Sequence, residues 1–221
     1  MVGLDPALRR LTRDIGKLLQ PYGFDGADPR WARVTPDGVA VVGRDRIQRT
    51  WTDGQQVARF GLAAAATPIA WWEFQQWRAA RHGRAHPPLA EATGPGLVET
   101  REIGAEGAES WSLGTDPAQE GQQVRQADLD ALRADLPRRV HACARRALRL
   151  LEPDRYLDEL LAVPDPDLAT REAIAILLAA QGQGPRLDEA LERLRAGAAA
   201  SAAVTAAADV VAYVRDRAPV A

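Results

Sequence analysis

The architecture follows from residues 39–65, whose sequence is VAVVGRDRIQRTWTDGQQVARFGLAAA. Apolar side chains such as Val39 and Val41 recur there at every second position, while arginine and glutamine occupy several positions between them. Successive side chains of a strand point to opposite faces, so this alternation predicts strands with one buried face. Asp53-Gly54 interrupts the pattern with turn chemistry, because glycine accepts positive φ. Residues 39–65 are therefore predicted to form an antiparallel hairpin.

Neighbouring segments extend this hairpin into a sheet. The segment 31–35 has strand character, and Pro36-Asp37-Gly38 joins it to the hairpin through a turn. Weaker patterns predict further strands at 97–103 and 109–113. The predicted fold class is α+β. It has an N-terminal helix, an antiparallel meander of three to five strands with helices on one face, and an all-helical C-terminal half.

Helical periodicity appears at both ends of the chain. An amphipathic helix is predicted to begin at Asp5-Pro6, a cap followed by proline, and to end near Pro21. A second helix begins in the same way at Thr67-Pro68. In the second half of the chain strand patterns disappear and apolar residues recur at helical spacing. We therefore predict a sheet domain over residues 1–116 and a helical region over residues 117–221, packed on or beside it.

Two residues interrupt the helical pattern of the second half. Pro137 removes a backbone donor, so the helix around it is expected to kink or restart, with Asp135 as a cap for the restarted part. Gly197 is expected to separate a helix that ends near Leu194 from a last, alanine-rich helix that reaches Arg217.

Composition excludes several classes of protein. Basic and acidic residues nearly balance, at 28 and 30, so no net field attracts nucleic acid or anionic lipid. Cys143 is the single cysteine, which excludes an internal disulfide. No apolar leader follows Met1, and the alanine-rich segment 196–208 is too weakly hydrophobic to span a bilayer. The expected location is the cytoplasm, without a membrane partner.

Short motifs spread along the chain resemble a bacterial family described as domain of unknown function 4304. They are Pro21-Tyr22-Gly23-Phe24, Trp31, the hairpin 39–65, Arg101-Glu102-Ile103-Gly104, Trp111, Leu151-Glu152-Pro153, Tyr156-Leu157 and Ala175-Ile176-Leu177-Leu178 before Gly182. The resemblance covers most of residues 5–196, and it departs from the family in a proline- and glycine-rich segment at 84–96. Proteins of this kind occur in bacterial toxin and immunity settings. The resemblance implies such a setting and transfers no catalytic residue.

The most unusual segment is aromatic. Trp71, Phe74 and Trp77 fall near one face of the second predicted helix, and Trp72 points elsewhere. A helix that crosses a sheet buries such a row, whereas aromatic side chains beyond the needs of a core anchor protein interfaces. Trp72, followed by Trp77, is our candidate for binding another protein.

An arginine strip is the second candidate binding surface. Arg44, Arg46 and Arg49 interrupt the apolar hairpin, and Arg59 lies on its returning strand. Together they would suit phosphate groups or an acidic protein on the open face of the sheet. The structural alternative is an ordinary solvated outer face.

No pattern in the sequence predicts a catalytic residue, a metal site or a cofactor. His82 and His86 have the spacing of helical metal ligands, but Gly83 between them and the following prolines favour a solvated loop. Cys143 lies on an apolar helix face and is predicted to be a buried hydrophobic side chain.

Three functions remain in competition at this point. The first is a non-catalytic protein-interaction module, immunity-like or toxin-associated, whose partner is another protein. The second is a protein that binds nucleic acid or phosphate through the strip Arg44, Arg46, Arg49 and Arg59. The third is an enzyme of unknown class with a site between the sheet and the helices. The oligomeric state is left open.

Overall fold

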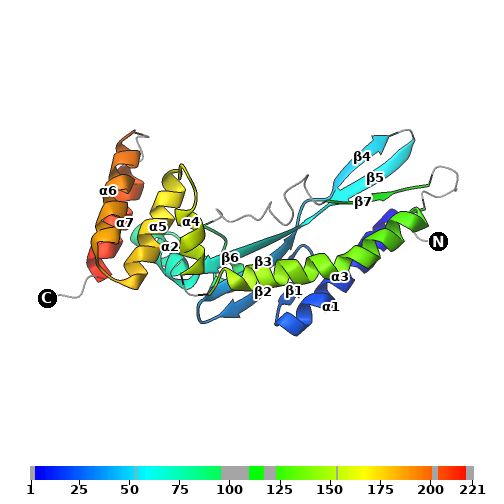
Figure 1. Ribbon diagram of the computed structural model, residues 1–221, viewed down its shortest axis with the longest axis horizontal. Helices are drawn as coiled ribbons and strands as arrows, with labels where there is room; N and C mark the ends of the chain where they lie inside the picture. Colours follow the sequence, from blue (N-terminus) through cyan, green and yellow to red (C-terminus); the bar gives the residue numbers. More distant parts are fainter. Residues whose placement is uncertain are drawn as a thin grey trace. The chain divides into compact units, whose positions relative to one another are not determined.

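The computed structural model describes residues 3–52, 54–95, 110–116, 123–152, 154–200 and 204–217. Its helices are α1 (Leu4–Leu19), α2 (Ile69–Arg81), α3 (Gln126–Arg149), α4 (Arg155–Leu161), α5 (Leu168–Gln181), α6 (Pro185–Ala200) and α7 (Val204–Arg217). Its strands are β1 (Asp25–Ala27), β2 (Arg30–Thr35), β3 (Gly38–Arg44), β4 (Gln48–Thr52), β5 (Gln55–Phe60), β6 (Leu62–Pro68) and β7 (Trp111–Gly114). Figure 1 shows the α+β arrangement, with a helical C-terminal half, which confirms the predicted class.

The described strands form two antiparallel sheets, not the single predicted meander. One sheet has the strand order β1-β2-β3-β6, and the other has the order β4-β5-β7. The chain leaves the first sheet after Arg44, builds the β4–β5 hairpin, and returns to the first sheet after Gly61. Apolar residues continue to alternate across the two points where the chain changes sheet. The alternation therefore predicts which residues are buried, but it does not predict which sheet they join. The predicted strand at 97–103 lies outside the described residues.

The described chain divides into two compact units. The sheet unit combines residues of 1–33, 40–65 and 99–149, and therefore includes α1, β4, β5, β7 and α3. The helical unit combines residues of 34–39, 66–98 and 150–221, and therefore includes α2 and α4 to α7. These units follow a different division from the predicted boundary at residue 116, because α3 belongs with the sheet and α2 with the helices.

The core of the sheet unit joins aromatic strand residues to two helices. Phe60 of β5 packs against Trp111 of β7, with ring centroids 5.5 Å apart, and both side chains are buried. Helices α1 and α3 contact each other, and α3 also contacts β7 (Figure 1). Cys143 is buried on α3, as predicted. Helix α3 runs through Pro137 as one element, so the expected restart there was wrong.

Asp135 makes side-chain contacts inside α3 where a helix cap was predicted. Its carboxylate accepts a hydrogen bond of 3.1 Å from Trp111 Nε1 and ion-pairs with Arg138 and Arg139. Burial raises the pKa of Asp135, but the bonds from Trp111 and Arg138 outweigh that effect and leave the pKa below its usual value. This carboxylate is therefore ionised at neutral pH and ties α3 to β7.

Helix α5 is the centre of the helical unit. It contacts α2, α4, α6 and α7, and residues 172–178 are all buried. Helix α6 continues through Gly197 to Ala200, so the expected helix break at Gly197 was wrong. A Cβ atom at Gly197 would lie 2.5 Å from Arg171 Nη1 of α5. Gly197 therefore lies beside the guanidinium of Arg171 and does not end the helix.

The helix starts differ from the predicted caps by one or two residues. Gly3 is the N-cap of α1, so Asp5 lies in the first turn, and Pro68 is the N-cap of α2. Such shifts are usual at helix ends. In contrast, α5 has a side-chain cap, because Asp167 Oδ1 accepts hydrogen bonds from the backbone N–H of Thr170 at 2.8 Å and from its hydroxyl at 2.6 Å.

Replacing Asp167 with alanine should lower the free energy of unfolding by about 1 kcal/mol, since a side-chain cap of a helix contributes that much. The bonds from Thr170 lower the pKa of Asp167. Its contribution is therefore complete above the ordinary aspartate pKa of about 3.9 and is lost as the pH falls through the lower, folded-state pKa. Urea unfolding at pH 7 and pH 3 measures both effects, and the difference between variant and parent should shrink at pH 3.

The matched control is Asp165→Ala. The Asp165 side chain is 98% exposed and lies 3.7 Å from Arg171, so its loss should change stability little. Equal losses in both variants would contradict the assigned cap.

Candidate functional site

The predicted arginine strip does not form one surface. Arg44 ends β3, and its side chain is only 10% exposed. Its Nε and Nη2 donate to the Asp28 carboxylate at 2.5 and 2.8 Å, and its Nη1 donates to the carbonyl of Asp45 at 2.7 Å. The bond with Asp28 raises the pKa of Arg44. Arg44 is therefore occupied within the protein and does not form part of an open binding surface.

The remaining arginines of the strip separate as well. In the β4–β5 ladder Gln48 lies opposite Arg59, and Arg49 lies opposite Ala58. Directly opposed residues share a face, so Arg49 and Arg59 point to opposite faces of the sheet. Arg49 ion-pairs with Asp5 at 2.5 Å, and the exposed Arg46 lies in the link between β3 and β4. The prediction of one basic face was wrong because it assumed one uninterrupted strand.

Strand β4 carries a large exposed aromatic side chain. Trp51 is 61% exposed, although it shares its face with the buried Ala58. Among the described strands β4 is at one edge of its sheet, with β5 as its neighbour. We call the residues 48–52 together with Arg46 the β4 edge. It combines an edge strand, an exposed tryptophan and two exposed arginines.

The predicted aromatic anchors Trp72 and Trp77 are partly buried and have contacts within the helical unit. Trp72 Nε1 donates to the carbonyl of Pro87 at 3.2 Å, and its ring meets that of His86 edge-on. Trp77 packs against Phe74 and against Tyr213 of α7, with ring centroids 6.3 and 5.3 Å away. The row on α2 thus packs against α7, where a sheet had been predicted.

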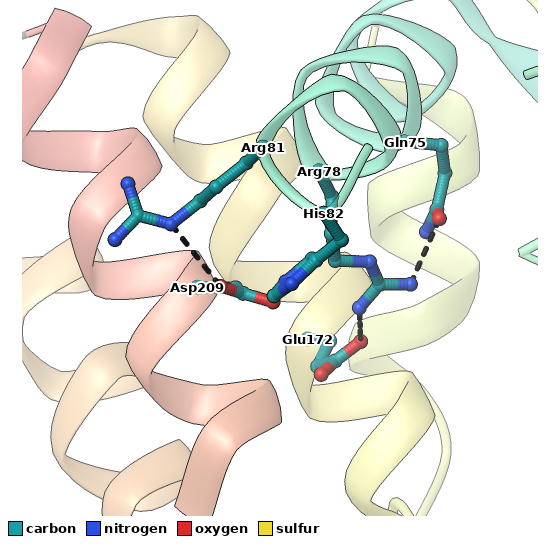
Figure 2. Close-up of polar contacts among 6 residues, drawn as sticks. All are labelled: Gln75, Arg78, Arg81, His82, Glu172 and Asp209. Carbon is teal, nitrogen blue, oxygen red and sulfur yellow. Dashed lines mark hydrogen bonds and ion pairs between the residues drawn. The ribbon is translucent and has the colours of Figure 1, made fainter. Parts of the chain in front are cut away.

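A cluster of charged side chains joins α2 to the two helices that it packs against (Figure 2). Arg78 of α2 donates to Glu172 Oε2 of α5 at 3.3 Å and to Gln75 Oε1 at 2.8 Å. The Glu172 side chain is 8% exposed. Burial raises the pKa of this carboxyl group, and the nearby Arg78 opposes the rise. A buried carboxylate of this kind needs the arginine beside it.

The second part of the cluster centres on Asp209 of α7. Its carboxylate is 10% exposed and lies between two residues from the end of α2. Asp209 Oδ2 is 2.8 Å from His82 Nε2, and Oδ1 is 3.7 Å from Arg81 Nε. Figure 2 shows both side chains reaching Asp209 from α2, next to the Arg78–Glu172 pair. His82 therefore forms a structural pair, where the sequence predicted a solvated loop.

A pocket of about 360 Å³ opens beside this cluster, within the helical unit. Its charged and polar lining comes from α2, from the segment after it and from α7: Gln75, Arg78, His82, Arg84, His86, Thr205 and Asp209. The buried Nδ1 of His86 has no hydrogen-bond partner among the described residues. His82 and His86, singled out in the sequence, are thus brought to one pocket.

Within the described ranges, no group of three or more histidine, cysteine, aspartate or glutamate side chains is placed to hold a metal ion. Glu73 ion-pairs with Arg217 at 2.9 Å. In the same part of the chain, no helix is both long and apolar enough to cross a membrane.

Sequence reasoning missed Glu172 and Asp209. Their partners are 94 and 127 residues away along the chain, so spacing alone could not pair them. One signal was present: Gln75, Arg78 and His82 recur at helical spacing on α2 and form a polar row beside the aromatic one.

Comparisons with protein-family models, curated proteins and solved structures found no match to this chain. The resemblance to domain of unknown function 4304 therefore stays a prediction.

Proposed function

We propose that this protein is a non-catalytic protein-interaction module of the bacterial cytoplasm. In this proposal the β4 edge binds an extended, acidic segment of a partner protein. The observation that carries the proposal is Trp51, a large aromatic side chain that is 61% exposed on a strand at the edge of its sheet. The setting implied by the family resemblance, immunity or toxin association, agrees with such a role.

An edge strand supports binding through its backbone. Its outer N–H and C=O groups are available to an added strand, which would extend the sheet β4-β5-β7 by one. Backbone bonds give affinity without sequence preference, so side chains must supply the selectivity. Trp51 is suited to that task, since tryptophan is enriched among the energetic anchors of interfaces.

The charge of the β4 edge indicates the chemistry of the partner. Arg46 is exposed, and its side chain has no partner among the described residues. Arg49 shares the face of Trp51, ion-pairs with Asp5 and is still 42% exposed. Two guanidinium groups beside an added strand favour carboxylates on it. We therefore propose an acidic protein segment. Single-stranded nucleic acid also combines negative charge with aromatic stacking, and the experiment separates the two.

The experiment places a photo-reactive amino acid at Thr50 and crosslinks the full-length protein in native cell extract. The crosslinked species is then identified and mapped. We expect an acidic protein segment, and a synthetic peptide of that segment should bind the purified protein. A crosslink to nucleic acid would replace this proposal with the alternative.

Replacing Trp51 with alanine should weaken binding of that peptide at least tenfold, because an interface anchor contributes about 2 kcal/mol or more. Calorimetric titration measures the affinity. The melting temperature should stay close to that of the parent, because the side chain is mostly exposed.

The control is Trp72→Ala. It removes the bond to Pro87 and should lower the melting temperature without changing peptide affinity. Unchanged affinity in Trp51→Ala would refute the proposed site.

A further inference from the structure

The pocket beside α2 and α7 is separate in its residues from the β4 edge. Its volume of about 360 Å³ lies at the small end of the range for ligand pockets. Ala79, Ala85 and Ala206 occur among its lining residues, and these short side chains leave room for a ligand. Its size fits a small metabolite.

Most of the charge around the pocket is already balanced. Arg78 is paired with Glu172, and the carboxylate of Asp209 is bound by His82 and Arg81. The exposed Arg84, which lines the pocket, has no side-chain partner among the described residues. Arg84 therefore adds one unpaired positive charge to the lining of the pocket.

A histidine with an unsatisfied buried atom forms part of the pocket wall. His86 lines it, and the Nδ1 atom of this ring is buried without a hydrogen-bond partner in the described part of the chain. Leaving such a group unpaired is unfavourable, so the position of this ring is not fixed by a hydrogen bond of Nδ1. The ring itself is held by the edge-on contact with Trp72.

We propose that this pocket binds a small anion through a carboxylate or phosphate group. The Arg84 guanidinium supplies charge-assisted hydrogen bonds, and the His86 ring forms part of the wall beside it. The Asp209–His82 pair closes one side of the pocket and keeps the ring of His82 in place. The function proposed for the β4 edge does not depend on this site.

Calorimetric titration of the full chain with inorganic phosphate and, separately, with succinate tests the proposal. We expect saturable binding of at least one of the two probes, and the stronger one identifies the anionic group. Arg84→Gln should weaken that binding at least tenfold. The control Arg195→Gln removes the same charge from an exposed position of α6 outside the pocket lining and should leave the affinity unchanged.

A second variant tests whether Arg84→Gln weakens binding only through a long-range effect of its charge. His86→Asn keeps a polar side chain, removes the ring from the pocket wall, and should also weaken binding. The melting temperature of Arg84→Gln should equal that of the parent, because no side-chain contact is lost. Absence of saturable binding by both probes, or equal affinity in Arg84→Gln and the parent, would overturn the proposal.

Discussion

Replacing Phe74 with alanine is expected to lower the free energy of unfolding by about 3–5 kcal/mol, the usual cost of removing a fully buried phenylalanine. Phe74 has no exposed surface and is the centre of the aromatic packing between α2 and α7. Its ring lies 5.6 Å from Trp71 and 5.1 Å from Tyr213, and the Arg78 guanidinium lies 4.9 Å from its centroid. Truncation would therefore leave a cavity and also loosen the arginine that holds Glu172.

Urea unfolding followed by circular dichroism measures this loss. Phe74→Leu keeps most of the volume and should cost clearly less than Phe74→Ala. Trp51→Ala removes a larger aromatic side chain from an exposed position and should cost little in the same assay. A cost below about 1 kcal/mol for Phe74→Ala would contradict the described core.

Replacing Gly38 with alanine should lower the free energy of unfolding about as much as Phe74→Ala does. The cause here is the backbone conformation and the close approach of other backbone atoms. Gly38 has a φ of 141°, which side-chain-bearing residues rarely adopt. A Cβ atom there would lie 2.1 Å from the carbonyl oxygen of Thr67 and 3.0 Å from the backbone nitrogen of Ile69. The Ile69 nitrogen cannot move independently, because its N–H donates to the carbonyl of Asp37 at 2.8 Å. We expect a loss of at least about 3 kcal/mol from strain and displacement together.

A control variant at Gly83 separates the backbone strain of a positive φ from the steric clash of the new Cβ atom. Gly83 has a φ of 64°, and a Cβ atom there would meet no atom within 4 Å. Gly83→Ala should therefore cost only about 1–2 kcal/mol, the penalty of the left-handed conformation itself. Equal unfolding midpoints for the two alanine variants would show that the close approach of Gly38 to Thr67 does not contribute.

Period-two alternation correctly predicted strands within residues 39–65. The prediction that these strands pair within one sheet was wrong. Alternation depends on burial of one face, which both sheets impose, so Val39 and Phe60 fit one pattern while belonging to different sheets. The link 45–47 and Gly61 mark the change of sheet, and neither has the composition of a strong turn. Sheet membership depends on the pairing of β5 with β7 and of β6 with β3, which local sequence does not encode.

Helices were predicted more accurately than the contacts between them. The apolar faces of α1, α3 and α5 follow from their own spacing, because each buries a stripe whatever its neighbour is. The ion pairs of Glu172 and Asp209 required knowledge of which helices meet. Pro137 and Gly197 misled for the same reason, since tertiary packing overrode their local preference for ending a helix.

The positions of the tryptophan residues allow the β4 edge to be followed by intrinsic fluorescence. All six tryptophans lie in the described residues, and Trp51 alone among them is exposed. Iodide, which quenches fluorescence by collision and does not enter folded cores, should therefore act mainly on Trp51. Shielding of this emission would reveal an occupied β4 strand in the unlabelled protein.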